Sequence, residues 1–142
     1  MYKVYCDGAS RGNPGPSGAG FAVFDAAGEL LHSDGLPLGQ TTNNVAEYTA
    51  LIEAAKYVKT LPADEVEFLM DSELVVKQIA GIYKVKATHL VPLYQEAVNL
   101  VASLNATCTH IPREQNKLAD KRANDGADMS EQAATTQRCL CQ

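Results

Sequence analysis

The chain has 142 residues, of which 46% are hydrophobic and 20% charged, and its net charge is −5. This length and composition are typical of one soluble globular domain with its own core, and they argue against a machine of several modules. No apolar run approaches the roughly 18 residues of a membrane span, and the first residues lack the apolar region of a signal peptide. We therefore expect a cytoplasmic protein without a membrane partner.

The charges are distributed unevenly along the chain. The segment from Lys77 to Arg122 has a net charge of +4, whereas the remaining residues sum to −9. A basic region on an acidic protein is compatible with one face that binds nucleic acid.

The four cysteines give no paired metal-binding spacing. Cys6 and Cys108 lie in apolar stretches, where we expect reduced, buried thiols. Cys139 and Cys141 could be redox-active or bind a metal, although no second pair of ligands accompanies them.

The first forty residues predict an antiparallel meander of three strands. Short β-rich runs are separated by a glycine-rich turn and by a second turn at residues 25–28. The expected strands are Tyr2–Asp7, Ala19–Phe24 and Glu29–Leu36.

From residue 41 the pattern changes to alternating helices and strands. Polar cap-type residues precede a helix that is apolar on most of its surface, Ser72 can cap a short helix and Gly81 can end it. The expected elements are helices over 45–58, 73–80, 90–104 and 117–128 and strands over 66–70 and 107–111.

Together these elements predict an α/β fold. Its mixed five-stranded sheet would combine the three-strand antiparallel meander with two parallel strands, and helices would cover the faces of the sheet. We expect one domain over residues 1–128 and a polar, flexible C-terminal tail over residues 129–142.

Four carboxylates occupy the ends of expected elements. Asp7 and Asp71 each follow an apolar strand directly, and Glu47 and Asp120 lie in the first turns of helices. Each could simply serve as a turn, cap or helix-dipole residue. If these carboxylates converged, they would repel one another, and bound divalent cations usually neutralise such a cluster. Oxygen ligands without a His or Cys pattern favour Mg²⁺ or Mn²⁺ over Zn²⁺.

Four motifs resemble the ribonuclease H type 1 family in order and spacing, from Tyr2 to about Asp128. They are Tyr5-Cys-Asp7-Gly8-Ala-Ser-Arg-Gly12-Asn13-Pro14-Gly15-Pro16-Ser-Gly18-Ala-Gly20, Thr42-Asn43-Asn44-Val-Ala-Glu47-Tyr-Thr-Ala-Leu, Asp71-Ser72-Glu73-Leu-Val, and Pro112-Arg113-Glu-Gln-Asn116-Lys-Leu-Ala-Asp120. One such motif would be weak evidence, but four in sequence are highly specific.

The resemblance implies an endoribonuclease that hydrolyses the RNA strand of RNA·DNA hybrids with two Mg²⁺ or Mn²⁺ ions. In such a site the ions activate the attacking water and stabilise the leaving 3′ oxygen. The family's catalytic and metal-binding carboxylates correspond to Asp7, Glu47, Asp71 and Asp120.

The resemblance also implies a surface that reads the hybrid. Gly12 and Asn13 would approach the minor groove, Asn43 and Asn44 would contact the hybrid, and Thr42 would hold a DNA phosphate. Amide side chains suit a surface that recognises 2′-hydroxyl groups.

Two departures from the family matter: one concerns a histidine implicated in product release, and the other weakens the expected grip on the substrate. The segment 111–116 is too short for the family's histidine-bearing loop, and we expect His110 to be a packed or edge residue. Arg113 could take part of that histidine's role, or could pair with an acid on the last helix. The basic protrusion is reduced to a segment that contains Lys84 and Lys86, which we expect to bind the substrate.

Two other functions remain as alternatives. A non-catalytic module that binds hybrids or duplexes could share the fold, but it would have no need for four acids beside a phosphate. A nuclease that acts on DNA is disfavoured by the amide surface at Asn13, Asn43 and Asn44. Double-stranded RNA is a further possible substrate, and a monomer is the expected state.

Overall fold

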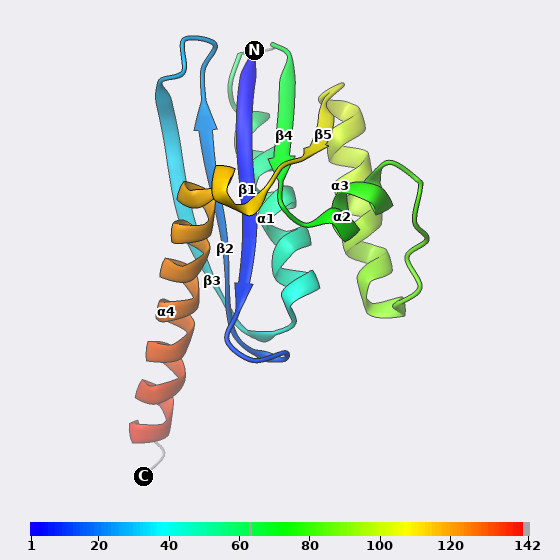
Figure 1. The fold of residues 1–142 in the computed structure, drawn as a ribbon. Helices are drawn as coiled ribbons and strands as arrows, with labels where there is room; N and C mark the ends of the chain where they lie inside the picture. The colour runs from blue at the N-terminus through cyan, green and yellow to red at the C-terminus, as the bar shows by residue number, and fades with distance from the viewer. Residues whose placement is uncertain (63, 141–142) are drawn as a thin grey trace.

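The computed structural model describes residues 1–62 and 64–140, and it contains the predicted mixed five-stranded sheet. The strand order is β3-β2-β1-β4-β5; β1 is antiparallel to β2 and parallel to β4, and β4 is parallel to β5 (Figure 1). The strands are β1 (Tyr2–Ser10), β2 (Gly15–Phe24), β3 (Leu30–Thr41), β4 (Val66–Met70) and β5 (Thr107–His110).

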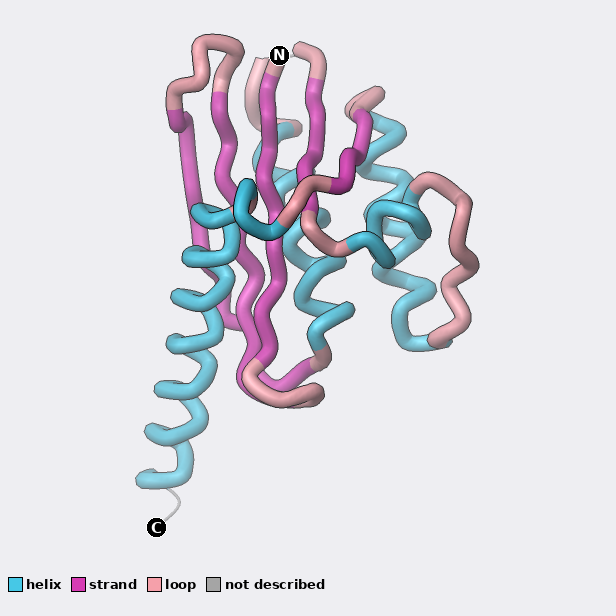
Figure 2. Tube along the Cα trace, in the orientation of Figure 1, coloured by secondary structure: helices cyan, strands magenta, loops and turns pink. Residues whose placement is uncertain are grey.

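Helices cover both faces of this sheet. In Figures 1 and 2, α4 crosses one face over β2 and β3, while α1 lies behind the sheet and α2 and α3 lie beyond β4. The helices are α1 (Asn43–Val58), α2 (Glu73–Ile79), α3 (Val91–Ser103) and α4 (Lys117–Leu140), with short 3₁₀ turns at Thr88–Leu90 and Arg113–Gln115.

The core lies between the sheet and α1. Apolar residues surround this helix, as its sequence predicts, and Tyr48 and Leu51 are fully buried against Val4 and Phe68 of the sheet. The α1 helix is therefore held on more than one side, which fixes the position of its N-terminal end.

The three strands of the meander are longer than predicted. Most of the glycine-rich segment that we expected to be a turn is paired strand, because β1 continues to Ser10, β2 begins at Gly15, and only residues 11–14 connect them. The small residues are needed for close packing on α4: a Cβ atom on Gly18 would lie 2.2 Å from the carbonyl oxygen of Ala123.

The predicted end of the last helix at Asp128 is wrong, because α4 continues through Leu140. Ser130, which we assigned to a flexible tail, is buried; its hydroxyl donates to the carbonyl of Ser17 at 2.6 Å and accepts from the backbone N–H groups of Leu38 and Gly39. The apolar spacing of α4 ends near Asp128, and beyond that residue these contacts of Ser130 hold the helix against β2 and β3. The domain boundary itself stays a prediction.

Several other predictions are confirmed. Ser72 caps α2, Gly81 follows that helix with a positive φ of 79°, and Cys6 is buried, whereas Cys108 is only partly buried. The side chain of Cys139 and all of Cys141 lie outside the described residues. No helix in the described part of the chain combines the length and apolar character of a membrane span.

Candidate active site

Asp7 lies inside β1 rather than at its end, which corrects the prediction. The parallel ladder between β1 and β4 ends at the pair Cys6 and Met70, so Asp7 and Asp71 each come directly after its last rung. The pairing of β1 with β2 continues, and Asp7 lies opposite Gly20. Asp7 is thus rigidly held in a strand at the point where β4 stops, and Asp71 follows β4 as predicted.

Glu47 comes to the same place from α1. The helix begins at Asn43, so Glu47 is in its second turn rather than the first, and its side chain is buried as predicted. Gly8 allows this approach, because a Cβ atom there would lie 2.4 Å from the backbone nitrogen of Glu47. The backbone of α1 therefore packs directly on β1, next to Asp7.

Asp7, Glu47 and Asp71 form a compact carboxylate cluster. One oxygen atom from each residue lies within 4.8 Å of the other two. Burial, followed by the negative charge of Glu47, raises the pKa of Asp7 well above its usual range. Burial also raises the pKa of Glu47, although a hydrogen bond shared with Asp7 opposes that shift. Without a cation, the cluster is thus an electrostatically unfavourable arrangement.

The side chains of this cluster fit a divalent cation. The Oε2 atom of Glu47 is buried and has no hydrogen-bond partner among the described residues. A buried, unpaired carboxylate oxygen is costly, and a cation held by Asp7, Glu47 and Asp71 would satisfy it. All the available ligand atoms are carboxylate oxygens, which suit a hard cation.

Asp120 approaches the cluster from the opposite face of the sheet. It lies in the first turn of α4, as predicted, and its carboxylate is close enough to Asp7 to accept a hydrogen bond that raises the pKa of Asp7. Its Oδ1 atom accepts a hydrogen bond from the side-chain amide of Asn124 at 3.3 Å. Asp120 therefore lies beside the three-carboxylate cluster as a fourth acid that contacts Asp7.

Arg113 faces the cluster rather than the last helix. Its Nε atom lies 3.5 Å from an oxygen of Asp71, while 83% of its side chain is exposed. The alternative in which Arg113 pairs with an acid on α4 is therefore wrong. His110 is exposed on β5, the edge strand, as predicted. Arg113 thus places a positive charge on a solvent-exposed side chain beside the carboxylates.

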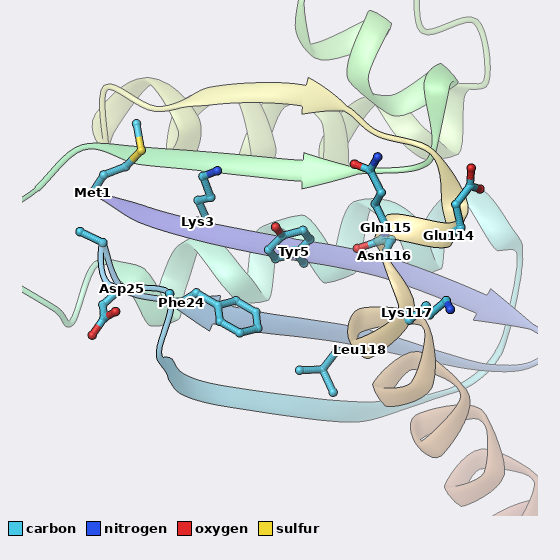
Figure 3. Close-up of a pocket in the computed structure, with 12 residues that line it drawn as sticks. Met1, Lys3, Tyr5, Phe24, Asp25, Glu114, Gln115, Asn116, Lys117 and Leu118 are labelled. Atoms are coloured by element: carbon cyan, nitrogen blue, oxygen red, sulfur yellow. The ribbon is translucent and has the colours of Figure 1, made fainter.

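Asn116 is a site residue to which the sequence analysis gave no role. It is 1% exposed, and its amide donates to the carbonyl of Cys6 at 2.9 Å and to Asp71 at 3.4 Å. Figure 3 shows Asn116 on the connection between β5 and α4, above β1. Asn116 also lines a pocket of about 590 Å³, together with Lys3, Tyr5 and other residues, and none of the four candidate site carboxylates lines this pocket. The sequence feature that could have identified Asn116 as a site residue is its position inside the fourth motif.

The expected substrate residues gather at the turn between β1 and β2 and at the start of α1. Gly12 has a positive φ of 98°, and the exposed Asn13 accepts a hydrogen bond from the backbone N–H of Asn43 at 3.1 Å. Thr42 caps α1 by accepting from the backbone N–H of Val45, and Asn44 is partly exposed. The turn and the helix start thus form one continuous surface.

Lys84 and Lys86 lie elsewhere, on the connection between α2 and α3. Both side chains are exposed. Neither lysine belongs to the carboxylate cluster. If they contact a substrate, they would bind a part of it away from the phosphate at the carboxylates.

Comparisons with known proteins agree with this architecture. The model of the family described as "Reverse transcriptase-like" matches residues 5–126. The bifunctional protein Rv2228c of Mycobacterium tuberculosis is 41% identical over 133 residues, which cover 92% of this chain and 36% of that protein. The ribonuclease HI of Halobacterium salinarum is 38% identical over 126 residues, which cover 88% of this chain and 63% of that protein. The chain thus spans about one third of the length of the first of these relatives.

A solved structure shares the fold and much of the sequence. The structure of LC11-RNase H1 in complex with an RNA/DNA hybrid is 40% identical, with a TM-score of 0.85 over 92% of this chain and 99% of that chain. The match to the family model covers all four carboxylates, and the sheet and helices superpose on those of a ribonuclease H1. The chain therefore belongs to the reverse transcriptase-like family and, within it, to the ribonuclease H type 1 proteins.

Proposed function

We propose that this chain is a metal-dependent endoribonuclease that hydrolyses the RNA strand of RNA·DNA hybrids. The observation that carries the proposal is the convergence of Asp7, Glu47 and Asp71 within 4.8 Å, with Asp120 beside Asp7. A binding module would gain nothing from a buried cluster of like charges, which costs stability and repels phosphate.

The four carboxylates have distinct surroundings, and we assign their roles accordingly. Asp7, Glu47 and Asp71 would hold divalent cations, Mg²⁺ or Mn²⁺, and Asp120 would complete the site from α4. When bound, such cations activate water and stabilise the leaving oxygen of a phosphodiester. The rigid supports of the four acids, a β-strand, two helices and a strand end, keep the ligand positions fixed before the substrate arrives.

The surface around the cluster supports a hybrid substrate. Asn13, Asn43 and Asn44 offer amide donors and acceptors at the linked turn and helix start, which suit the 2′-hydroxyls of an RNA strand. We assign Gly12 to close approach to the groove, and Thr42 to a DNA phosphate in addition to its cap. LC11-RNase H1, which is 40% identical, was solved with an RNA/DNA hybrid.

The cations near the site extend this surface. Arg113 would bind the scissile phosphate region, because it is exposed and adjacent to Asp71. Lys84 and Lys86 would bind phosphates farther along the duplex. We propose a monomer as the active state and treat cleavage of double-stranded RNA as an outcome to be measured.

The test is a substrate panel with the purified chain. We expect cleavage of the RNA strand in a labelled hybrid with Mg²⁺ or Mn²⁺, and none with chelator or with duplex DNA. Asp71→Asn should remain folded and lose cleavage. Glu114→Gln, on the exposed connection before α4, is the matched control and should retain it. Hybrid binding without cleavage under either metal would favour the binding module instead.

A further inference from the structure

Arg11 joins two parts of the molecule that are far apart in the sequence. It is the first residue of the turn between β1 and β2, and its guanidinium reaches α4. There it donates to the carboxylates of Asp128 and Glu131, the latter at 3.0 Å, and to the backbone carbonyl of Asn124 at 3.2 Å. This arginine ties the turn that carries Gly12 and Asn13 to the last helix.

The same turn is held on its other side by α1. Asn13 accepts from the backbone N–H of Asn43, the first residue of α1. At the base of the turn, the hydroxyl of Ser10 at the end of β1 donates to the carbonyl of Thr41 at the end of β3, at 3.1 Å. The turn is therefore fastened between two helices, and Arg11 provides the fastening to α4.

A second path leads from Arg11 to the acidic site. The Nη2 atom of Arg11 lies 3.4 Å from the side-chain oxygen of Asn124, and the amide nitrogen of Asn124 donates to the Oδ1 atom of Asp120 at 3.3 Å and to its carbonyl at 3.0 Å. The arginine can only donate and the carboxylate can only accept, so these two neighbours fix which way the Asn124 amide faces. Arg11 and Asp120 are thus linked through one intermediate side chain, that of Asn124.

We propose that Arg11 is a positioning residue that couples the substrate-binding turn to the fourth carboxylate of the site. The coupling rests on the proposed function, and it adds a role for two residues, Arg11 and Asn124, outside the set of candidate catalytic and substrate-binding residues. Loss of the guanidinium should release the turn and the Asn124 amide together, whereas loss of the Asn124 side chain should release only Asp120.

The test measures binding and chemistry separately. Hybrid affinity is measured by fluorescence anisotropy in chelator, and the cleavage rate is measured in a single turnover at saturating hybrid. Arg11→Met should weaken binding threefold to tenfold and slow cleavage at least tenfold. Asn124→Ala should leave the affinity within twofold of wild type. It should slow cleavage at least tenfold, as Arg11→Met does. The double variant should cleave no more slowly than the slower single variant, because both changes interrupt one path.

Arg122→Met is the matched control. Arg122 lies on α4, the helix that Arg11 contacts, and its side chain is 35% exposed against 31% for Arg11. It contacts Ser33 of β3 and Asp125 and is not connected to the turn. Arg11→Lys is a second variant that keeps the positive charge and loses the forked geometry, and it should restore part of the affinity and little of the cleavage rate. If Arg11→Met matches Arg122→Met in both assays, the proposal is overturned.

A readout without substrate separates this proposal from the proposed function. Amide hydrogen exchange in residues 11–13 should speed up at least threefold in Arg11→Met and stay unchanged in Arg122→Met. If the wild-type chain fails to cleave any hybrid while this exchange difference is present, the proposed function fails and the fastening of the turn stands. Equal exchange in the two variants contradicts the fastening.

Discussion

Gly20 lies opposite Asp7 in the ladder between β1 and β2, and α4 occupies the space where a side chain of Gly20 would be. A Cβ atom there would lie 2.3 Å from the carbonyl oxygen of Ala119, the residue before Asp120. Because Gly20 has no side chain, α4 can pack against the sheet closely enough for Asp120 to reach Asp7.

Gly20→Ala should displace α4 and damage the site more than the fold. We expect a loss of stability of about 1–3 kcal/mol from overpacking. The single-turnover rate should fall by at least about tenfold, since small displacements of catalytic groups have large effects on rate. Gly28→Ala is the control: Gly28 has a positive φ of 82° and open space around it, so its replacement strains the turn between β2 and β3 without pressing on α4. Thermal unfolding and cleavage rates for both variants check this, and equal losses of activity would contradict it.

The metal-free protein should lose stability as the pH rises, because of its buried acids. The pKa values of Asp7 and Glu47 are raised above their ordinary values of 3.8 and 4.5. The folded state therefore holds protons more strongly than the unfolded state. The associated stability is fully present below about pH 4 and is lost as the pH rises toward the raised pKa values.

Asp7→Asn should remove the part of this dependence on pH that comes from Asp7. In chelator, the free energy of unfolding of the variant minus that of the wild type should grow between pH 5 and pH 8, by at least about 1 kcal/mol, since one pKa unit corresponds to about 1.4 kcal/mol. Chemical denaturation at several pH values measures it. Added Mg²⁺ should narrow the difference by stabilising the wild type. A difference that is independent of pH would show that the cluster is not strained.

Arg113 and His110 should differ in their effects on turnover. Arg113 contacts Asp71, whereas His110 lies on the exposed edge strand, so Arg113→Ala should lower steady-state turnover more than His110→Ala. If Arg113 assists departure of the cleaved strand, its loss should slow steady-state turnover more than the single-turnover rate. A large loss in His110→Ala with Arg113→Ala unaffected would return the histidine to the mechanism.

Lys84 and Lys86 should contribute to the salt dependence of binding. If each lysine neutralises one phosphate, Lys84→Ala plus Lys86→Ala should reduce the slope of log affinity against log salt by about 2. The control is Lys56→Ala plus Lys59→Ala at the C-terminal end of α1, which should leave the slope unchanged. Titrations of hybrid binding at several salt concentrations measure the slope. An unchanged slope in the Lys84 and Lys86 double variant would show that this segment does not bind the substrate.

Local signals in the sequence were sufficient for the elements that they define. Strand Val66–Met70 and the Ser72 cap were predicted correctly because an apolar run and a cap residue specify them without distant contacts. The four acids were found from their places at element ends and from the family motifs. The contacts that hold the site in place were not predicted. The position of Asp7 inside a longer strand depends on the register with β2, and the position of Asn116 depends on a hydrogen bond to a carbonyl 110 residues away.

The extension of α4 shows the same limit. The apolar spacing of this helix ends near Asp128, and its continuation depends on Ser130 meeting backbone groups of β2 and β3, contacts that no local pattern reveals. Arg11 likewise gains its role only when the turn and α4 are brought together.

The most direct test of a hydrolytic carboxylate site is the origin of the oxygen in the products. Wild-type chain should cleave a hybrid with Mg²⁺ or Mn²⁺ in ¹⁸O-labelled water, and mass spectrometry of the RNA fragments should find 5′-phosphate ends that carry the label and unmodified 3′-hydroxyl ends. Asp71→Asn, prepared in parallel, controls for contaminating nucleases and should give no labelled fragments. Products that end in a 2′,3′-cyclic phosphate, or equal labelling with Asp71→Asn, would contradict the account.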